Sequence, residues 1–307
     1  MARSWENYVI STDHTDLTVE EYLKQILHCS GRRLQKLTRS KGLRLNGKPV
    51  FLQKKVQSGD RLQIAVAGDD SGAIIAEAGA VDILYEDEFL AVLNKPSGIL
   101  VHPTGQTTSG TLVNFLAFRW RSLGLSPAVH PVHRLDRDTS GCLIVAKTAS
   151  GQSRLEQQLK SGIIKRRYHA LVQGHPNPAT GTIDAPIGPH PRLANRRSVT
   201  ATGDPALTHY ATIESFSEHS LLELWLETGR THQIRVHLAH REHPVLGDAM
   251  YGRRSPLMPR QALHAVAITF QRLSDGTCVT VEAPRPADFQ RAYEALTAHI
   301  TVVAKTD

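Results

Sequence analysis

The chain has few of the features that mark membrane-bound, secreted or disulfide-stabilised proteins. Of its 307 residues only three are cysteines, and their wide spacing suits neither a disulfide framework nor a C-x-x-C pair. The polar N-terminal stretch has no apolar core of signal-peptide length, and no apolar run approaches the length of a membrane span. We therefore expect a soluble, monomeric protein of the cytoplasm that does not associate with membranes.

The chain also lacks the loops that bind nucleotide-type cofactors. Neither G-x-G-x-x-G nor a Walker loop occurs, which disfavours a nucleotide-dependent enzyme such as an RNA methyltransferase. Four histidines cluster at His232, His237, His240 and His243, but their spacing is not that of a zincin helix, and no cysteine or well-spaced acid completes a metal site. We interpret these histidines as structural or phosphate-contacting, and we expect neither a metal nor a cofactor.

Positive charge is concentrated near the N-terminus. Residues 17–66 contain eleven lysines and arginines against three acids, a net charge of +8, which leaves −1 for the rest of a chain whose net charge is +7. Such a segment attracts phosphate backbones, and that part of the binding energy depends on salt. A solvated basic surface is the alternative, but the concentration of charge in one foldable segment favours binding to nucleic acid.

Residues 17–66 are predicted to form two helices followed by a small sheet. Thr18 and Glu21 have the spacing of a capping box that opens an amphipathic helix. Ser30 is expected to cap a second helix, which exposes basic side chains. Asn46-Gly47 is typical of a hairpin turn between two strands, and an alternating run after it predicts a third strand.

The rest of the chain is predicted to be a separate α+β unit. Residues 67–80 are rich in Ala, Gly, Asp and Ser, which is typical of a flexible linker. Strand and turn signals resume in residues 81–300, where a hairpin around residues 86–88 is followed by short strands and by helices at 151–161 and 286–300. Strands and helices do not alternate regularly, so an α+β fold is favoured over a doubly wound sheet.

The most informative segment is residues 133–141, with the sequence HRLDRDTSG. It places Asp136 between Arg134 and Arg137, and a carboxylate with close cations keeps its charge. Turn residues follow, and the apolar run 142–146 predicts a short buried strand. Asp136 would then lie on a loop held by a rigid sheet, where catalytic groups are common, although an ordinary solvated turn is the alternative.

This segment resembles the HRLD-x-x-TSG signature of the RluA-type pseudouridine synthases, which isomerise uridine in structured RNA. Further segments resemble other motifs of that family in the same order, at residues 94–98, 167–174, 227–237 and 247–252. Residues 17–66 resemble the alpha-L RNA-binding domain. The resemblance implies a pseudouridine synthase fold with a central, mostly antiparallel sheet at residues 81–300, preceded by a small α+β RNA-binding domain at residues 17–66 and the linker at 67–80.

The resemblance also implies roles for five residues of the second unit. Asp136 is the catalytic carboxylate, acting on the sugar as a nucleophile or as a base, and Arg235 pairs with it. Tyr168 stacks on the target base, and its hydroxyl could assist proton removal. Ile234 supplies an apolar wall, and Arg134 fills the gap that the flipped uridine leaves in the RNA stack. Because the isomerisation needs neither external energy nor redox chemistry, no cofactor is required.

The expected partner is RNA. Large-subunit ribosomal RNA is favoured, because family members with an alpha-L domain mostly resemble enzymes of that RNA, and transfer RNA is the second choice. A non-catalytic RNA-binding or ribosome-assembly protein is the competing class. The expected RNA-binding residues are basic side chains of the first unit: Arg32, Arg33, Lys36, Arg39, Lys41, Arg44 and Lys48.

Overall fold

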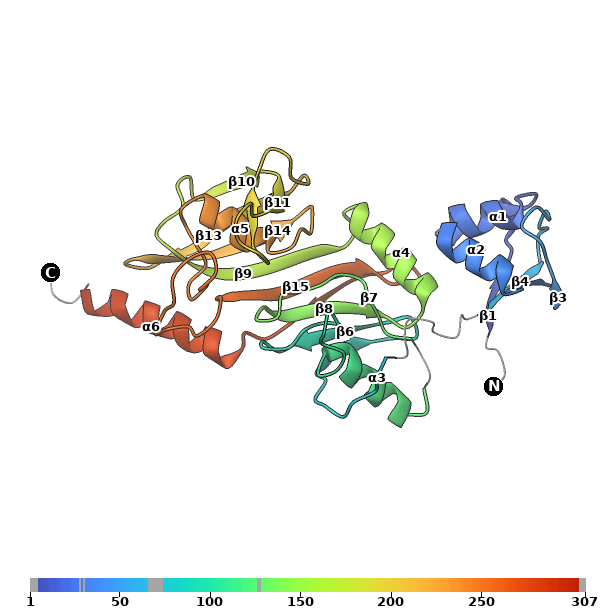
Figure 1. Cartoon of the computed structure of the whole chain (residues 1–307), viewed down its shortest axis with the longest axis horizontal. Helices are drawn as coiled ribbons and strands as arrows, with labels where there is room; N and C mark the ends of the chain where they lie inside the picture. Colours follow the sequence, from blue (N-terminus) through green and yellow to red (C-terminus); the bar gives the residue numbers. More distant parts are fainter. Residues whose placement is uncertain (1–4, 28, 30, 66–73, 126–127, 304–307) are drawn as a thin grey trace.

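The computed structural model describes residues 5–27, 29, 31–65, 74–125 and 128–303, without the side chains of residues 32, 33 and 299–303. The chain forms a small first unit and a larger second unit (Figure 1). No helix among these residues is long and apolar enough to cross a membrane. The first unit contains β1 (Trp5–Val9), a 3-10 turn (Thr12–His14), α1 (Val19–Glu21), a π-helical turn (Tyr22–Ile26), α2 (Gly31–Arg39), β2 (Leu43–Leu45), β3 (Lys48–Pro49) and β4 (Arg61–Ala65).

The local signals of the first unit are confirmed. The hydroxyl of Thr18 accepts a hydrogen bond from the backbone N–H of Glu21 at 3.1 Å, and the Glu21 carboxylate accepts one from the backbone N–H of Thr18 at 2.7 Å, which completes the capping box. Asn46 and Gly47 have φ angles of 52° and 81°, as a tight turn between β2 and β3 requires. The helices and the four-stranded sheet, in the order β1-β4-β2-β3, enclose an apolar core.

The small sheet extends beyond the boundary predicted at residue 17. β1 pairs antiparallel with β4, so residues 5–9 belong to the same sheet. The side chains of β1 are half-buried or exposed. The strand therefore has no buried apolar face, which is the pattern that would have predicted it from the sequence. Two expectations lie outside the described residues, namely Ser30 as a helix cap and the part of the linker at residues 67–73. The linker at 67–80 therefore stays a prediction.

The second unit is built on one large sheet. Its elements are β5 (Ile83–Glu86), β6 (Leu90–Lys95), α3 (Leu112–Ser122), β7 (His130–Pro131), β8 (Ser140–Ala146), α4 (Ala149–Lys160), β9 (Lys165–Gln173), β10 (Thr180–Asp184), β11 (Ile187–Pro189), β12 (Arg197–Val199), β13 (Leu207–Ser215), β14 (His219–Leu226), α5 (Gln233–His240), β15 (Leu263–Gln271), β16 (Cys278–Glu282) and α6 (Ala287–Val303). The predicted hairpin and the two predicted helices correspond to β5–β6, α4 and α6.

The central sheet is mostly antiparallel, as the resemblance implies. Its ten strands follow the order β10-β13-β14-β9-β15-β8-β6-β5, with β16 paired to β15 and β7 paired to β8. Among the described pairings of this sheet, only β15 with β8 is parallel. β15 therefore joins two antiparallel halves of the sheet, one ending at β9 and the other at β8. The mixed arrangement confirms the α+β class.

Apolar side chains cover both faces of the sheet centre. In β6, Ala91 and Leu93 face one core with α3 and α6, whereas Leu90 and Val92 face a second core that includes Leu155 of α4. Every residue of β8 is buried, which explains why the run 142–146 is apolar without alternation. A strand fixed on both faces is a rigid support for the loop before it, and that loop carries Asp136.

Candidate active site

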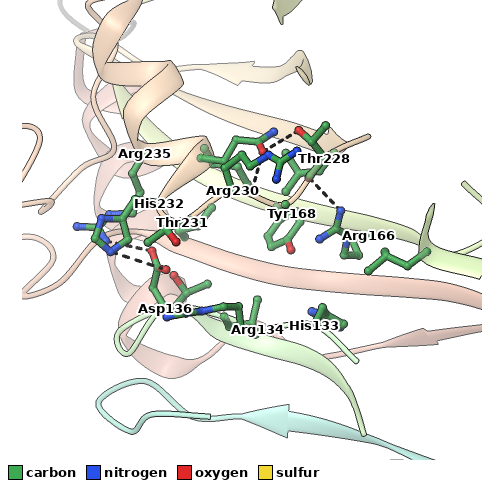
Figure 2. A pocket seen from close by; sticks show the side chains of 18 of the residues that line it. His133, Arg134, Asp136, Arg166, Tyr168, Thr228, Arg230, Thr231, His232 and Arg235 are labelled. Carbon is green, nitrogen blue, oxygen red and sulfur yellow. Dashed lines mark hydrogen bonds and ion pairs between the residues drawn. The ribbon is translucent and has the colours of Figure 1, made fainter. Parts of the chain in front are cut away.

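A cavity of about 530 Å³ lies where the Asp136 loop, β9 and the segment entering α5 meet. It is lined by all five residues to which the resemblance assigns a role in the second unit: Arg134, Asp136, Tyr168, Ile234 and Arg235. These residues come from segments about a hundred positions apart in the chain, and Figure 2 shows Arg134, Asp136, Tyr168 and Arg235 around one space. The geometry therefore brings the predicted constellation together, while the role of each member stays a prediction.

A buried lysine at the end of β6 holds the Asp136 loop. Lys95 Nζ donates hydrogen bonds to the backbone carbonyls of Pro96, Arg137 and Thr139 at 2.8, 2.7 and 2.9 Å. The side chain is fully buried, and burial lowers the pKa of Lys95 to about 7, against the opposing charges of Asp138 and Asp136. Three carbonyl oxygens around one nitrogen are acceptors suited to an ammonium group. The loop is thus held through the backbone carbonyls of Arg137 and Thr139.

The following residues seat the loop against β15. Gly141 has a φ of 110°, and a Cβ at this position would lie 2.2 Å from the carbonyl oxygen of Ala265. Only glycine permits this close approach of two backbones. Nearby, Arg260 donates to the carbonyl of Asp138 at 2.8 Å and pairs with both oxygens of Asp288 at 2.7 and 2.9 Å. Strand β15 and the start of α6 therefore determine where the loop lies.

Arg235 is shared between two carboxylates. Its Nη1 donates to Oδ2 of Asp136 at 3.0 Å, while Nε and Nη2 form a two-pronged pair with Asp248 at 2.7 and 3.0 Å. Burial opposes the charge of Arg235, but the hydrogen bonds and charges of Asp248 and Asp136 outweigh it and raise its pKa. The backbone N–H groups of Met250 and Tyr251 donate to Asp248 in turn, at 2.9 and 3.2 Å. A permanent, oriented cation therefore faces Asp136.

His232 approaches the other oxygen of Asp136. It precedes α5 with a left-handed φ of 59°, and its Nε2 lies 4.0 Å from Oδ1 of Asp136. The hydroxyl of Tyr251 accepts from the backbone N–H of Arg197 at 2.9 Å and lies 2.8 Å from Nδ1 of His232. A Tyr251 hydroxyl that donates to Nδ1 would leave the imidazole proton on Nε2, toward Asp136. Burial lowers the pKa of His232, and this favours the neutral ring.

Tyr168 and Ile234 form apolar surfaces of the cavity. Tyr168 projects from the middle of β9 with 4% of its surface exposed, and Ile234 is buried in the first turn of α5. Burial raises the pKa of the Tyr168 phenol, and the nearby cation Arg166 opposes this shift only in part. Arg134 lines the cavity from the loop and is exposed. A cavity with such apolar surfaces beside charged groups can accept a flat, weakly polar ring.

Two expectations from the sequence concern the cations beside Asp136 and the histidine cluster. Arg137, taken as a close cation of Asp136, instead donates its Nε–H to the carbonyl of Gly98 at 3.1 Å. That interpretation was wrong in detail, because a turn sends the two neighbouring side chains apart and the ion pair comes from Arg235. In the histidine cluster, His237 is buried between Thr208 and the carbonyl of Ala185, as a structural histidine would be. Among the described residues no group of three His, Cys, Asp or Glu is arranged to hold a metal.

The basic residues of the first unit lie away from this cavity. Lys36, Arg39, Lys41, Arg44 and Lys48 are exposed, and the guanidinium of Arg44 lies 4.3 Å from the centre of the Trp5 ring. The side chains of Arg32 and Arg33 are outside the described part of the structure, although their backbone belongs to α2. None of the five described side chains lines the cavity. Their proposed contact with RNA stays a prediction.

Sequence reasoning missed several polar residues of the site, among them Asp248, Tyr251 and Arg166. Asp248 and Tyr251 fall in the segment 247–252, whose motif was noted without any role, and Arg166 immediately precedes the tyrosine segment. The available signal for these residues was their position within or beside a segment that resembles a family motif. The hydrogen bonds that give these residues a task depend on tertiary contacts between distant segments, which no local pattern contains.

Comparisons with known proteins agree with this geometry. Residues 89–240 match the family described as RNA pseudouridylate synthase, and residues 7–62 match the RluD ribosomal pseudouridine synthase N-terminal domain. The chain is 39% identical to an RNA pseudouridine synthase of Bacillus subtilis named YhcT, over 87% of this chain and 89% of the relative. It is also 39% identical to ribosomal large subunit pseudouridine synthase D of Nitrosomonas europaea, over 91% and 84% of the two chains.

The fold is shared with solved structures as well. The human RNA pseudouridylate synthase domain containing 1 protein superposes with a TM-score of 0.57 and 28% identity, covering 68% of this chain and 86% of that one. Fold, cavity and relatives define an RNA-modifying isomerase. The chain belongs to the RNA pseudouridine synthase family.

Proposed function

We propose that the cavity binds a flipped uridine and that Asp136 is its catalytic carboxylate. One observation supports this most directly: Asp136 faces an apolar slot while Arg235 holds one of its oxygens at 3.0 Å. The side chain of Asp136 keeps 18% of its surface exposed and lines the cavity. Its second oxygen makes no hydrogen bond to a side chain among the described residues, and Nε2 of His232 lies 4.0 Å from it. A fixed carboxylate with only one oxygen in such a hydrogen bond suits an attack at the sugar or the removal of a proton from it.

The reaction breaks the bond between C1′ of the ribose and N1 of uracil, turns the base, and forms a bond from C1′ to C5. Asp136 would act at C1′ as a nucleophile or at C2′ as a base, and both routes begin with the same ionised carboxylate. Tyr168 would stack on the base, and Ile234 would close the slot. Because burial raises the pKa of Tyr168, the neutral phenol prevails near pH 7, which favours stacking over a role as base.

Extrusion of the uridine requires compensation in the RNA. Unstacking a base costs a few kcal/mol, and a planar cation at the mouth of the cavity can stack in its place. Arg134 is exposed there, two residues before Asp136. We assign it this role because a guanidinium offers both a flat face and a charge for nearby phosphates.

The Asp136 assignment is tested with Asp136→Asn, which keeps the shape of the side chain and removes its charge. Chemical mapping of pseudouridine should show no product with the variant, whereas RNA affinity should stay near that of wild type. Asp138→Asn is the matched control, since this neighbouring acid does not line the cavity and should remain active. Full activity of Asp136→Asn would refute the assignment, and inactivity of the wild type on all cellular RNA would favour a non-catalytic RNA-binding protein.

We propose large-subunit ribosomal RNA as the substrate. The support is the set of similar proteins named ribosomal large subunit pseudouridine synthase D and the match of residues 7–62. Transfer RNA is the alternative. Pseudouridine maps of total RNA from cells with and without the gene decide between them, because a site lost from transfer RNA alone would overturn the proposal.

We also propose that the protein acts as a monomer in the cytoplasm. The cavity is complete within one chain, since Asp136, Tyr168 and Arg235 all come from the same second unit. Sedimentation at micromolar concentration should give the mass of a single chain, 33.8 kDa. A stable dimer under these conditions would contradict the proposal.

A further inference from the structure

The cavity has a second polar end, at Arg166. This residue lies two positions before Tyr168 on β9, so both side chains project from the same face of the strand. Arg166 is 6% exposed, and its Nη2 donates to the carbonyl of Thr228 at 3.0 Å. A Cβ at Gly229 would lie 3.0 Å from Nη1, so the glycine leaves room for the guanidinium. Its Nε–H is buried and has no hydrogen-bond partner among the described residues.

His133 presents a second donor at this end. The backbone N–H of Ile144 donates to Nε2 of His133 at 3.2 Å, which places the imidazole proton on Nδ1. Nδ1 is buried and makes no hydrogen bond of good distance and angle in the described part of the chain, although the backbone of Arg134 lies close enough to oppose part of the lowering of the His133 pKa. Burial, aided by the charge of Arg166, lowers the pKa of His133 to about 3. The ring therefore stays neutral, with a single N–H available.

Two buried donors without an acceptor are costly, about 1–3 kcal/mol for each unsatisfied group. Arg166 and His133 both line the cavity. A ligand acceptor that reached these N–H groups would offset the cost, and a buried donor left unpaired in a native protein calls for such an explanation. In Figure 2, Tyr168 stands between Asp136 on one side and Arg166 and His133 on the other. A ring stacked on Tyr168 would therefore present its far edge to the two donors.

The chemistry of the reaction supplies the acceptor. When the bond from C1′ to N1 breaks, both bonding electrons stay with uracil, and the negative charge spreads over N1 and the two carbonyl oxygens. The charge is discharged when C5 binds C1′, C5 loses its proton and N1 gains one. A donor that meets a carbonyl oxygen binds more strongly in the anion than in the neutral base, which is the requirement for accelerating the step.

We propose that Arg166 and His133 donate hydrogen bonds to one carbonyl oxygen of the flipped uracil and stabilise the uracil anion that forms during the isomerisation. This inference rests on the proposed use of the cavity as the uridine site. Arg166 is then a catalytic residue at the opposite end of the base from Asp136. In this proposal Asp136 acts on the ribose at one end of the cavity, and Arg166 stabilises the negative charge of the departing uracil at the other end.

A carbonyl oxygen suits this end better than a phosphate. The cations Lys160 and Arg230 line the same cavity together with Val132, Leu226 and Leu263, but a phosphate that reached the buried N–H groups of Arg166 and His133 would have to give up its hydration at a high cost. An uncharged uracil loses less hydration free energy than a phosphate when it enters the cavity, since both faces of its ring are apolar. Arg166 and His133 together also offer only a few N–H groups, whereas a phosphate has several oxygens to satisfy.

The protein-side test replaces the guanidinium. Arg166→Met should slow the single-turnover rate at saturating RNA on the order of 10²-fold, the usual loss when one donor to a developing anion is removed, with RNA affinity little changed. The RNA is a stem-loop carrying one uridine that wild type modifies. Arg167→Met is the control, because Arg167 lies next in the strand on the opposite face and pairs with Glu223 and Glu282. A weaker RNA affinity with an unchanged rate would mean a phosphate contact and overturn the proposal.

The substrate-side test does not depend on how the variants fold. The same stem-loop is made with 2-thiouridine or 4-thiouridine at the target, since sulfur is a weak acceptor. At the oxygen that is contacted, the thio change and Arg166→Lys or Arg166→Met should not add, whereas at the other oxygen they should. Full additivity at both positions would overturn the proposal. If wild type itself leaves the uridine unchanged, the proposed function fails instead.

Discussion

The two units use lysine and arginine in opposite ways. In the first unit Lys36, Arg39 and Lys48 are exposed to solvent, whereas in the second unit Lys95 and Arg235 are 0% and 6% exposed and have their N–H groups directed at specific acceptors. An exposed cation acts through its charge, so any cation in that place serves. A buried cation acts through the positions of its N–H groups, so its identity matters. The net charge of a segment therefore reveals exposed cations such as those of the first unit, but it does not reveal buried cations such as Lys95 and Arg235.

The difference has an energetic basis. Removing a cation from water costs several kcal/mol, and only well-placed partners offset the cost. Arg235 has two carboxylates, and Lys95 has three carbonyls. An exposed cation of the first unit needs no such partners, because its charge remains hydrated, and a phosphate that bound there would replace the water and release a counterion. The first unit is thus suited to capture and the second to positioning.

The largest expected effect comes from breaking the buried pair. Arg235→Ala should reduce turnover by roughly 10²–10³-fold, as for loss of a donor to an active-site anion, because Asp136 loses its orienting cation. Arg235→Lys should recover only a part of the turnover. The three N–H groups of an ammonium share one nitrogen, so they cannot reproduce the spread of Nε, Nη1 and Nη2 over two carboxylates. Single-turnover kinetics at saturating RNA provide the measurement. Near-normal turnover of Arg235→Ala would remove the pairing from the mechanism.

The exposed counterpart of that comparison is Arg39→Lys in α2, which keeps the charge and changes the shape. We expect no measurable change in RNA affinity or turnover from it. If Arg39→Lys weakened binding as strongly as Arg39→Gln, the first unit would also be reading geometry, and the contrast between the units would fail.

The next effect concerns Asp248. Asp248→Asn removes one of the two anions from a buried arginine, and breaking a buried pair on one side costs roughly 3–5 kcal/mol. The free energy of unfolding, from urea titration, should fall by about that amount. Asp136→Asn is the matched control, because Asp136 is more exposed, 18% against 1% for its side chain, and contributes one hydrogen bond rather than two. Equal losses in the two variants would mean that Arg235 does not depend mainly on Asp248.

A smaller loss of stability is expected at Lys95. Lys95→Met keeps the length of the side chain but leaves three carbonyls without their shared donor, which costs about 1–3 kcal/mol for a buried group left unsatisfied. The thermal midpoint should fall, and turnover should fall with it because the Asp136 loop loses its support. Lys48→Met in the first unit tests the comparison, since an exposed substitution should stay within about 0.5 kcal/mol of wild type.

The smallest effects per residue belong to the basic surface. Removing one cation that binds a phosphate should flatten the log–log dependence of RNA affinity on salt by roughly 0.7–0.9 units. Lys36→Gln with Arg39→Gln should therefore flatten the slope without changing which uridine is modified. Fluorescence titrations at several salt concentrations give the slope.

Deletion of residues 1–66 sharpens the same comparison. The second unit should remain folded, although the hydrogen bonds of Glu6 and Tyr8 with Ser150, at 2.8 and 3.1 Å, disappear. It should bind RNA more weakly with a shallower slope, yet still isomerise a small RNA at high concentration. An unchanged affinity and slope would show that the basic surface is merely solvated.

The irregular alternation of strands and helices predicted the α+β class, whereas the central sheet and the meeting of Asp136 with Arg235 were implied only by the resemblance of the motifs to those of a known family. The sequence did not predict that Arg137 turns away to Gly98, since the direction of a side chain in a turn depends on what packs around it. Nor did it predict the tasks of Asp248 and Arg166. Their partners, Arg235 and the carbonyl of Thr228, come from other segments, and such hydrogen bonds exist only once those segments are folded together.

The position of β15 in the sheet has a consequence for the order in which the protein becomes active. β15 separates β8 from β9, and its parallel contact joins His264 and Ala265 to Ser140 and Gly141, more than a hundred residues earlier. Contacts of such long sequence separation form late in folding. During synthesis, the half that carries Asp136 and the half that carries Tyr168 are both made before the strand that joins them. A nascent chain must therefore extend past Gln271 and clear the ribosome before its own catalytic cavity can close.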